Sequence, residues 1–248
     1  MDINLASKLN EKGLEIFADG NARQAIKYLK DSYCSYSSEK GILVNLGLVY
    51  MQLGKIEKAE RCYKEAITSN DIKTKRAAYK NLGFLYLWRG EWEEGWKSHA
   101  KRFLGEKFLE HQWKGEPLNG KVLLVWNDVG MGDIFQFIRY TKPLIQNGEK
   151  IILAPHKSQI AIIKNRLAWK VSKVVDRDSV LPLENNILHI PLMNLVGLID
   201  PDTRWGRNWD EKTWICENRI KEKNKTGICW ASNPGDKTMY KYKSIGIE

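Results

Sequence analysis

The chain has 248 residues, 43% of them hydrophobic, which is enough to bury one large core or two modest ones. Its net charge of +10 would suit an anionic partner, but acidic residues are interleaved with the basic ones, as on ordinary solvated surfaces, and nothing favours a nucleic acid. There is no secretory leader at Met1 and no apolar run near the ~20 residues of a bilayer span, so we expect a soluble, cytoplasmic protein without a membrane span.

The cysteines and histidines argue against metal and disulfide chemistry. None of the four cysteines has the spacing of a zinc site, and the four histidines do not cluster. We therefore expect reduced thiols and no protein-bound metal. The cysteines are Cys34, Cys62, Cys216 and Cys229.

The first part of the chain carries an internal repeat. Gly13 and Gly47 are 34 residues apart, and so are Ala25 and Ala59. This period, with small residues where two helices cross, is typical of the tetratricopeptide repeat. Residues 1 to about 70 therefore predict two antiparallel helix pairs. The positions that match the repeat best are Leu46, Gly47, Tyr50, Gly54, Ala59, Tyr63 and Ala66.

A third and weaker copy follows 36 residues on, with Gly95 and His99 where alanine and an aromatic residue are expected. A terminal repeat that caps the stack and meets another domain is expected to diverge in this way. We assign residues 1–112 to a domain of about three repeats. Such repeats either form a groove that binds a protein partner or serve as a rigid support packed on the next domain.

Tryptophans are concentrated at the end of the repeats. Trp88, Trp92 and Trp96 lie four residues apart, which places them on one helix face or its adjoining turn, and Trp113 follows. Exposed tryptophans could stack on sugar rings. An aromatic seam that joins the last repeat to the next domain explains them more simply, and we expect His99 to pack in that interface.

The second half of the chain is organised around residues 121–142. Residues 121–126 form a short apolar run that is typical of a buried parallel strand. Gly130 and Gly132 predict a turn that needs a permissive backbone. Asp133 follows where a helix is expected to begin, so it is either a helix N-cap or a functional carboxylate.

A strand, a glycine turn and a helix place backbone N–H groups at the carboxyl end of a strand, where open α/β sheets bind ligands. Two common phosphate-binding motifs do not fit. A dinucleotide fingerprint would need glycine at Phe135. Residues 115–121 approximate a P-loop, but Val122 replaces the hydroxyl residue and the run precedes the strand.

From residue 121 onward, predicted strands and helices alternate, which indicates a parallel sheet with right-handed crossovers. Pro117, between Gly115 and Gly120, marks the boundary before it. The fold class is therefore α + α/β: helical repeats followed by a Rossmann-like parallel sheet. Residues 205–214 are expected to cover the sheet or to form an acceptor-binding lip. The further strands are expected at 150–154, 171–175, 187–190 and 226–230, and the helices at 158–165 and 192–199.

Two signatures suggest a family for the whole arrangement. Residues 113–140, which include Gly130, Met131, Gly132 and Asp133, and residues 228–234 together resemble tetratricopeptide-repeat proteins that carry a heptosyltransferase-like (glycosyltransferase family 9) domain. That family has the B-type glycosyltransferase fold of two Rossmann-like halves. The resemblance implies that residues 113–220 form the first, acceptor-binding half. Residues 221–248 would begin the nucleotide-sugar-binding half, which is incomplete in this chain.

The resemblance implies a metal-independent, inverting transfer of a sugar from a nucleotide-sugar to the hydroxyl of a glycan or protein acceptor, without a cofactor. Asp133 would be the general base, and Gly130, Met131, Gly132 and Asn233 would contact substrate. The chain alone is expected to be inactive until the missing half is supplied. The alternative is a non-catalytic scaffold that binds a protein partner through its repeats.

Overall fold

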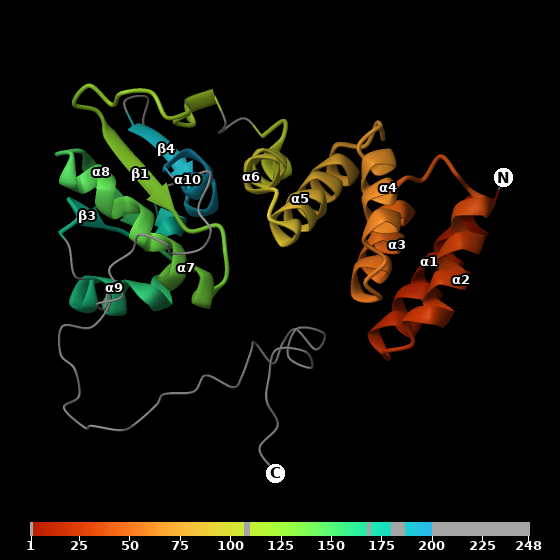
Figure 1. Ribbon diagram of the computed structural model, residues 1–248. Coiled ribbons are helices and arrows are strands. Elements are labelled where there is room, and N and C mark those ends of the chain that lie inside the picture. The colour runs from red at the N-terminus through yellow and green to blue at the C-terminus, as the bar shows by residue number, and fades with distance from the viewer. Residues whose placement is uncertain (1, 107–109, 168–169, 180–186, 200–248) are drawn as a thin grey trace, which may run out of the picture.

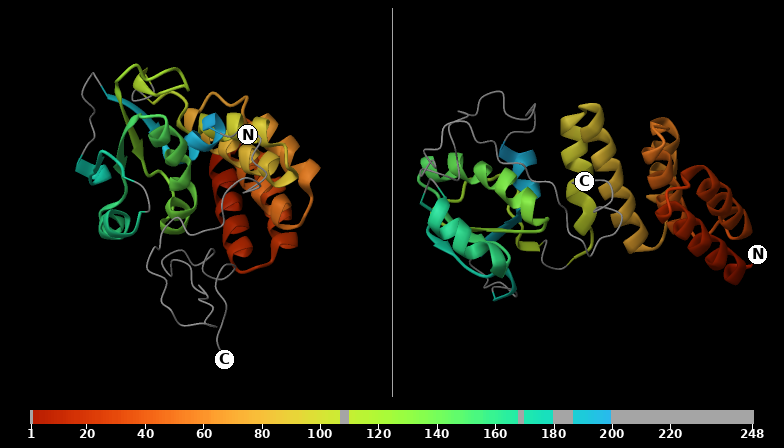
Figure 2. Two further views of the ribbon diagram at one scale, coloured as in Figure 1. Left: turned by 60° about the vertical axis from the view of Figure 1, so that its left-hand side comes forward. Right: turned by 90° about the horizontal axis from the view of Figure 1, so that it is seen from below.

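The computed structural model describes residues 2–106, 110–167, 170–179 and 187–199 (Figure 1). Its first part is a row of three antiparallel helical hairpins, which we call the helical arm, and its second part is a unit built on a parallel sheet. Figure 2 shows the arm leading away from the sheet, so that the N-terminus lies far from the strands. The expected α + α/β class is confirmed. The hairpins are α1 (Ile3–Ala18) with α2 (Ala22–Ser35), α3 (Gly41–Gln52) with α4 (Ile56–Ala66), and α5 (Ile72–Arg89) with α6 (Trp92–Ala100).

In each hairpin, a glycine of the first helix faces the residue 16 positions later in the second. A Cβ atom at Gly47 would lie 2.3 Å from the ring of Tyr63, and one at Gly83 would lie 2.6 Å from the backbone nitrogen of His99. Gly13 holds the equivalent place in the first hairpin. The helices cross so closely that a methyl group would collide in a densely packed interior. The glycine spacing in the sequence therefore reports a packing requirement.

The sheet is fully parallel, with the strand order β3-β2-β1-β4. The central strand β1 (Val122–Trp126) pairs with β2 (Lys150–Ala154) on one side and β4 (Ile187–Pro191) on the other. The short β3 (Lys173–Val174) extends β2 and covers only part of the strand expected at 171–175. The strand expected at 226–230 and the cover expected at 205–214 lie outside the described residues.

Both faces of the central strand are buried, which explains its continuous apolar run. Leu123 and Val125 belong to the core beneath the helices of the sheet unit. Leu124 and Trp126 face the other way and pack with Phe103, which follows the helical arm. The helices of the unit are α7 (Met131–Phe137), α8 (Lys142–Gln146), α9 (Ile160–Arg166) and α10 (Leu192–Ile199).

The last hairpin of the arm shares its core with the sheet unit. Leu87 and Trp96 are buried in the same cluster as Leu123, Trp113 belongs to it, and Trp92 packs against it. Helix α6 lies against α10 (Figure 1). These contacts form the aromatic seam that the tryptophan spacing suggests. Trp88 is the exception, since it is 69% exposed at the end of α5.

Candidate functional site

The carboxyl edge of the parallel sheet is the candidate site of the sheet unit. The chain leaves β1 toward β2 on one side, and β4 lies on the other side, so the order of strands reverses at β1. In open α/β sheets, the crevice beside such a reversal is where ligands bind. The loop after β1, residues 127–130, and the start of α7 lie at this edge.

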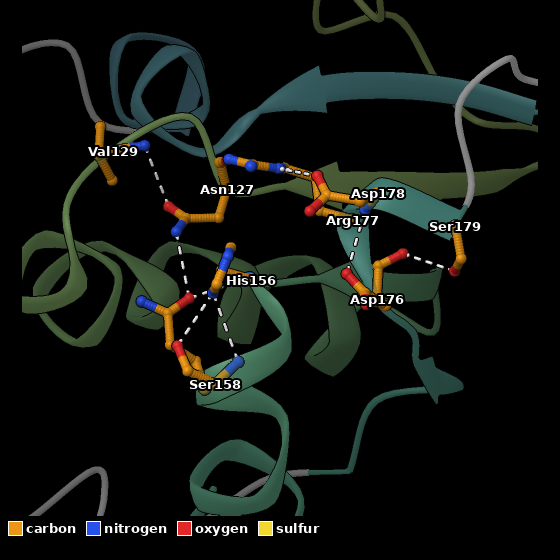
Figure 3. Close-up of polar contacts among 9 residues, drawn as sticks. Asn127, Val129, His156, Ser158, Asp176, Arg177, Asp178 and Ser179 are labelled. Atoms are coloured by element: carbon orange, nitrogen blue, oxygen red, sulfur yellow. Dashed lines mark hydrogen bonds and ion pairs between the residues drawn. The ribbon is translucent and has the colours of Figure 1, made fainter.

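Two buried amide side chains hold the loops of this edge in place (Figure 3). Asn127, which follows β1, donates from Nδ2 to Gln159 Oε1 (3.2 Å) and accepts from the Val129 backbone N–H (3.1 Å). The same Gln159 oxygen accepts from the His156 N–H (3.0 Å) in the loop after β2. Because both amides are buried, their bonds are costly to break and fix the two loops together.

His156 and Arg177 both belong to the loops at this edge (Figure 3). The Arg177 backbone N–H donates to the carbonyl of Pro155 (2.9 Å), the residue before His156, and its Nη1 donates to the Asn127 carbonyl (3.1 Å). The imidazole Nδ1 of His156 lies 3.0 Å from Ser158 Oγ and 3.4 Å from the Ser158 backbone nitrogen. Arg177, whose Nε is also ion-paired with Asp178 (3.0 Å), thus places a cation next to the loop that follows β1.

Asp133 is exposed in the first turn of α7. The helix begins at Met131 with Gly130 as its N-cap, so the interpretation of Asp133 as the N-cap residue is wrong. Its carboxylate folds back over the start of the helix, since Oδ2 lies 3.2 Å from where a Cβ atom of Gly130 would be. The helix end can stabilise this negative charge. Asp133 thus presents a solvent-accessible carboxylate beside the edge.

The two glycines of this turn have ordinary backbone angles. Gly130 is extended, with φ −66° and ψ 170°, and Gly132 is already inside the helix. Any residue can adopt these conformations, so the expected need for a permissive backbone is wrong. A side chain at Gly132 would meet nothing within 4 Å, which leaves open space next to Asp133. Asn233, the other residue assigned to substrate contact, lies outside the described residues.

The β1–β4 side of the edge is occupied by a side chain from the turn that follows the helical arm. Arg102, in the turn after α6, forms an ion pair with Asp128, which directly follows Asn127. Asp128 also accepts the Met193 backbone N–H (3.3 Å) at the start of α10. Both charged side chains are almost fully buried, so the reversal point is filled by an internal ion pair.

The enclosed space near this edge is small. Val125, Ile134 and Leu192 are among the residues that line an apolar cavity of about 10 Å³ below the loops. That volume suffices for roughly one water molecule. This cavity is too small for a sugar, and the surface formed by the loops and α7 carries the exposed Asp133.

The helical arm has a larger hollow, which we call the arm groove. It has a volume of about 390 Å³ and lies between α1 and α3. Asn10 and Asn45 join its two sides through a 3.0 Å bond from Asn45 Nδ2 to Asn10 Oδ1. Glu39 and Tyr36 contribute further polar groups from the preceding turn. Amide, hydroxyl and carboxylate groups beside Ile42 suit a polypeptide, which carries both polar and apolar groups.

An exposed apolar stripe continues from this groove along the first helices of the hairpins. Leu14, Leu48 and Phe84 are 36%, 41% and 43% exposed, and they occupy equivalent positions of the three repeats. Leu14 lies one turn after Asn10, and Leu48 lies three residues after Asn45, so stripe and groove share a face. A partly exposed apolar side chain at the same position of each repeat makes this face a candidate surface for another molecule, although Phe84 also packs against the ring of His99 (centroids 4.8 Å apart).

Within the described residues, no group of three or more histidine, cysteine or acidic side chains is arranged to hold a metal ion. The helices there are also too short or too polar for any of them to cross a membrane. Cys34 and Cys62 are free thiols, and burial raises the pKa of Cys62 to about 11. That thiol is therefore protonated and unreactive at neutral pH.

Sequence reasoning missed Arg102, Asp128, Gln159 and Arg177. A weak signal was present, because Asn127 and Asp176 directly follow predicted strands and His156 comes two residues after another, where parallel strands converge on one edge. No comparable pattern marks Arg102, because its partners Asp128 and Asn194 are 26 and 92 residues away in the chain.

Comparison with known proteins supports the repeats. A search of curated proteins finds no match to this chain. Residues 42–70, which cover α3 and α4, match the tetratricopeptide repeat family.

Proposed function

We propose that the sheet unit is the acceptor-binding half of a glycosyltransferase and that Asp133 is its general base. The exposed carboxylate of Asp133 beside the carboxyl edge of a Rossmann-like parallel sheet is the observation that supports this most. Open space at Gly132 would allow an acceptor to approach it. Gly130, Met131 and Gly132 would contact the acceptor through their backbone.

The proposed reaction joins an acceptor hydroxyl to the anomeric carbon of a nucleotide-sugar. Asp133 takes the hydroxyl proton while the acceptor oxygen forms a bond to that carbon. The carbon–oxygen bond to the nucleotide diphosphate breaks, and the diphosphate leaves with the electron pair. Attack from the opposite side inverts the anomeric configuration. A positioned carboxylate supplies typically ~10²–10⁴-fold in such a step.

Transfer by the full chain, supplemented with a separately expressed nucleotide-sugar-binding half, tests the proposal. We expect Asp133→Asn to lower the rate by about 10²-fold or more while leaving the fold intact, since asparagine removes the base and keeps the shape. Asp31→Asn, a matched change of an exposed carboxylate on α2, should leave the rate unchanged. Equal rates for Asp133→Asn and the unaltered chain would exclude Asp133 as the base.

A second function is favoured by the tetratricopeptide match and the exposed stripe. We propose that the helical arm binds an extended segment of a protein partner, with its polar groups in the arm groove and its apolar side chains on Leu14, Leu48 and Phe84. This function requires no catalysis. The chain would then be a scaffold, and the sheet unit would serve as its end cap.

A library of random peptides displayed on phage would test the arm. Peptides selected on the full chain should carry apolar residues and lose binding when Leu48 and Phe84 are changed to glutamine. Leu5→Gln is the control and should leave peptide binding unchanged. Leu5 is 45% exposed but lies nine residues before Leu14, on the opposite side of α1. Selected peptides that bind Leu48→Gln/Phe84→Gln as well as the unaltered chain would contradict the proposal.

A further inference from the structure

We infer that Arg102, in the turn that follows the helical arm, is the positioning residue of the loop that carries the candidate site. The guanidinium lies between the end of the arm and the loop of residues 127–130. It contacts this loop at Asp128, which is five residues before Asp133 in the chain. The inference concerns the structure of this loop. Its consequence for sugar transfer rests on the proposed function.

The guanidinium is held from three directions. Its Nη1 donates to the His99 carbonyl (2.9 Å) in α6 and to Asn194 Oδ1 (2.6 Å) in α10, while Nη2 contacts Asp128. The planar guanidinium reaches these acceptors from two nitrogens in a fixed fork, whereas a lysine ammonium would have to reach all of them from one. Arg102 therefore connects the arm, the loop after β1 and the helix after β4 through one side chain.

The two charges depend on each other because water hardly reaches them. The Arg102 side chain is 8% exposed and that of Asp128 is 1% exposed. Burial lowers the pKa of Arg102, and the neighbouring Asp128 carboxylate opposes that shift. If Arg102 is removed, Asp128 must regain solvent, take up a proton or remain a buried unpaired charge. The loop is the part of the edge that can move to expose it, and we infer that it does.

Asn194 supports the same view. Its Oδ1 accepts from Arg102, but its Nδ2 has no hydrogen-bond partner among the residues that the structure describes, although the side chain is buried. A buried amide that meets only half of its bonding capacity is costly. Loss of the bond from Arg102 would remove the hydrogen bond that the structure shows at the buried Oδ1 of Asn194.

The position of the ion pair gives it functional weight. It fills the edge at the reversal between β1 and β4, where sheets of this kind usually bind a ligand. The open part of the edge is then the side of Asp133, His156 and Arg177. The loop between the two sides ends in Gly130, the N-cap of α7, so its placement sets the direction of that helix and of Asp133.

Amide hydrogen exchange of the full chain tests the inference. Arg102→Met should speed exchange at Val129 and Met193, whose N–H groups donate to Asn127 and Asp128, by about tenfold or more, because the buried carboxylate pulls the loop open. Arg102→Lys should give a smaller effect, since it keeps the charge without the fork. Arg76→Met, which breaks the more exposed pair of Arg76 with Glu106, should leave these amides unchanged.

A double variant separates positioning from stability. Arg102→Met/Asp128→Asn removes both buried charges and keeps an oxygen acceptor for the Met193 N–H, so its melting temperature should recover much of what Arg102→Met loses. Exchange at Val129 should stay fast, because nothing ties the loop to the arm. Exchange that returns to normal together with the melting temperature would overturn the inference, as would normal exchange in Arg102→Met.

These readouts do not require sugar transfer. If Asp133→Asn leaves transfer unchanged while the Arg102 variants still free the loop, the proposed base is wrong and the positioning role stands. If Asp133→Asn abolishes transfer while the Arg102 variants leave amide exchange in the loop unchanged, only the positioning role is wrong.

Discussion

Gly197 of α10 lies directly against Trp96 of α6: a Cβ atom at Gly197 would be 2.7 Å from the Cβ of Trp96. The two residues belong to the sheet unit and to the helical arm. Their contact is one of backbone against side chain, so it leaves no room for even a methyl group. Arm and sheet unit therefore meet at a close-packed surface, and we expect them to behave as one body.

We predict that Gly197→Ala separates these two helices and destabilises the chain. Overpacking of this kind costs typically about 1–3 kcal/mol. Urea unfolding followed by tryptophan fluorescence would measure it, since Trp96 lies at the contact. Gly132→Ala is the control, because that position opens to free space and alanine favours a helix. A Gly197→Ala chain as stable as the Gly132→Ala chain would contradict the close packing.

The glycines of the hairpins should differ in their tolerance of alanine. At Gly47 the obstacle is the Tyr63 side chain, whereas at Gly83 it includes the backbone nitrogen and Cα of His99. Gly47→Ala should therefore be partly rescued by Tyr63→Leu, which shortens the obstructing side chain. Gly83→Ala cannot be rescued by trimming one side chain. Melting temperatures of the two single variants and the Gly47→Ala/Tyr63→Leu double variant would check this ranking.

The stability of the chain should fall in mild acid because of His99. Burial lowers the pKa of His99 to about 3, and the positive charges of Arg102 and Lys80 act in the same direction. In the unfolded chain the same imidazole takes up its proton near pH 6.5. The contribution is therefore fully present above about pH 6.5 and is lost as the pH falls toward 3.

Within that window, His99 should lower the free energy of unfolding by roughly 1.4 kcal/mol per pH unit. Urea unfolding at pH 7, 6 and 5 would show the loss. His99→Asn places an amide oxygen near the position of the ring nitrogen that Arg102 contacts, and it cannot titrate. Its unfolding free energy should depend less on pH, and an unchanged slope would rule out His99 as the cause.

The buried amide of Asn127 should be needed for the sheet edge. Asn127→Leu keeps the size of the side chain but leaves Gln159 Oε1 with one partner fewer and the Val129 N–H without its acceptor. Unsatisfied buried groups of this kind cost roughly 1–3 kcal/mol. Thermal unfolding would measure the loss of stability. Asn147→Leu, the same replacement at an exposed asparagine, is the control. A neutral Asn127→Leu would show that water replaces the lost bonds.

Much of the fold follows from local patterns. The 34-residue spacing of Gly13 and Gly47 predicts the hairpins, since glycine is required wherever two helices cross without space for a side chain. The apolar run of β1 predicts a strand buried on both faces. The exact start of α7 could not be predicted, because Gly130 and Asp133 can both cap a helix and only the placed backbone distinguishes them.

The sequence by itself determined the helical repeats, the order of strands and helices, and the strand–turn–helix segment that holds Asp133. These depend on periodicity and on neighbours a few residues away. Only the tertiary structure decided that Arg102 fills the reversal point of the sheet, that Asn127 and Gln159 join two loops, and that Leu14, Leu48 and Phe84 remain exposed together. Such relationships join residues far apart in the chain, and no local pattern encodes which side chains the packing of arm and sheet will bring together.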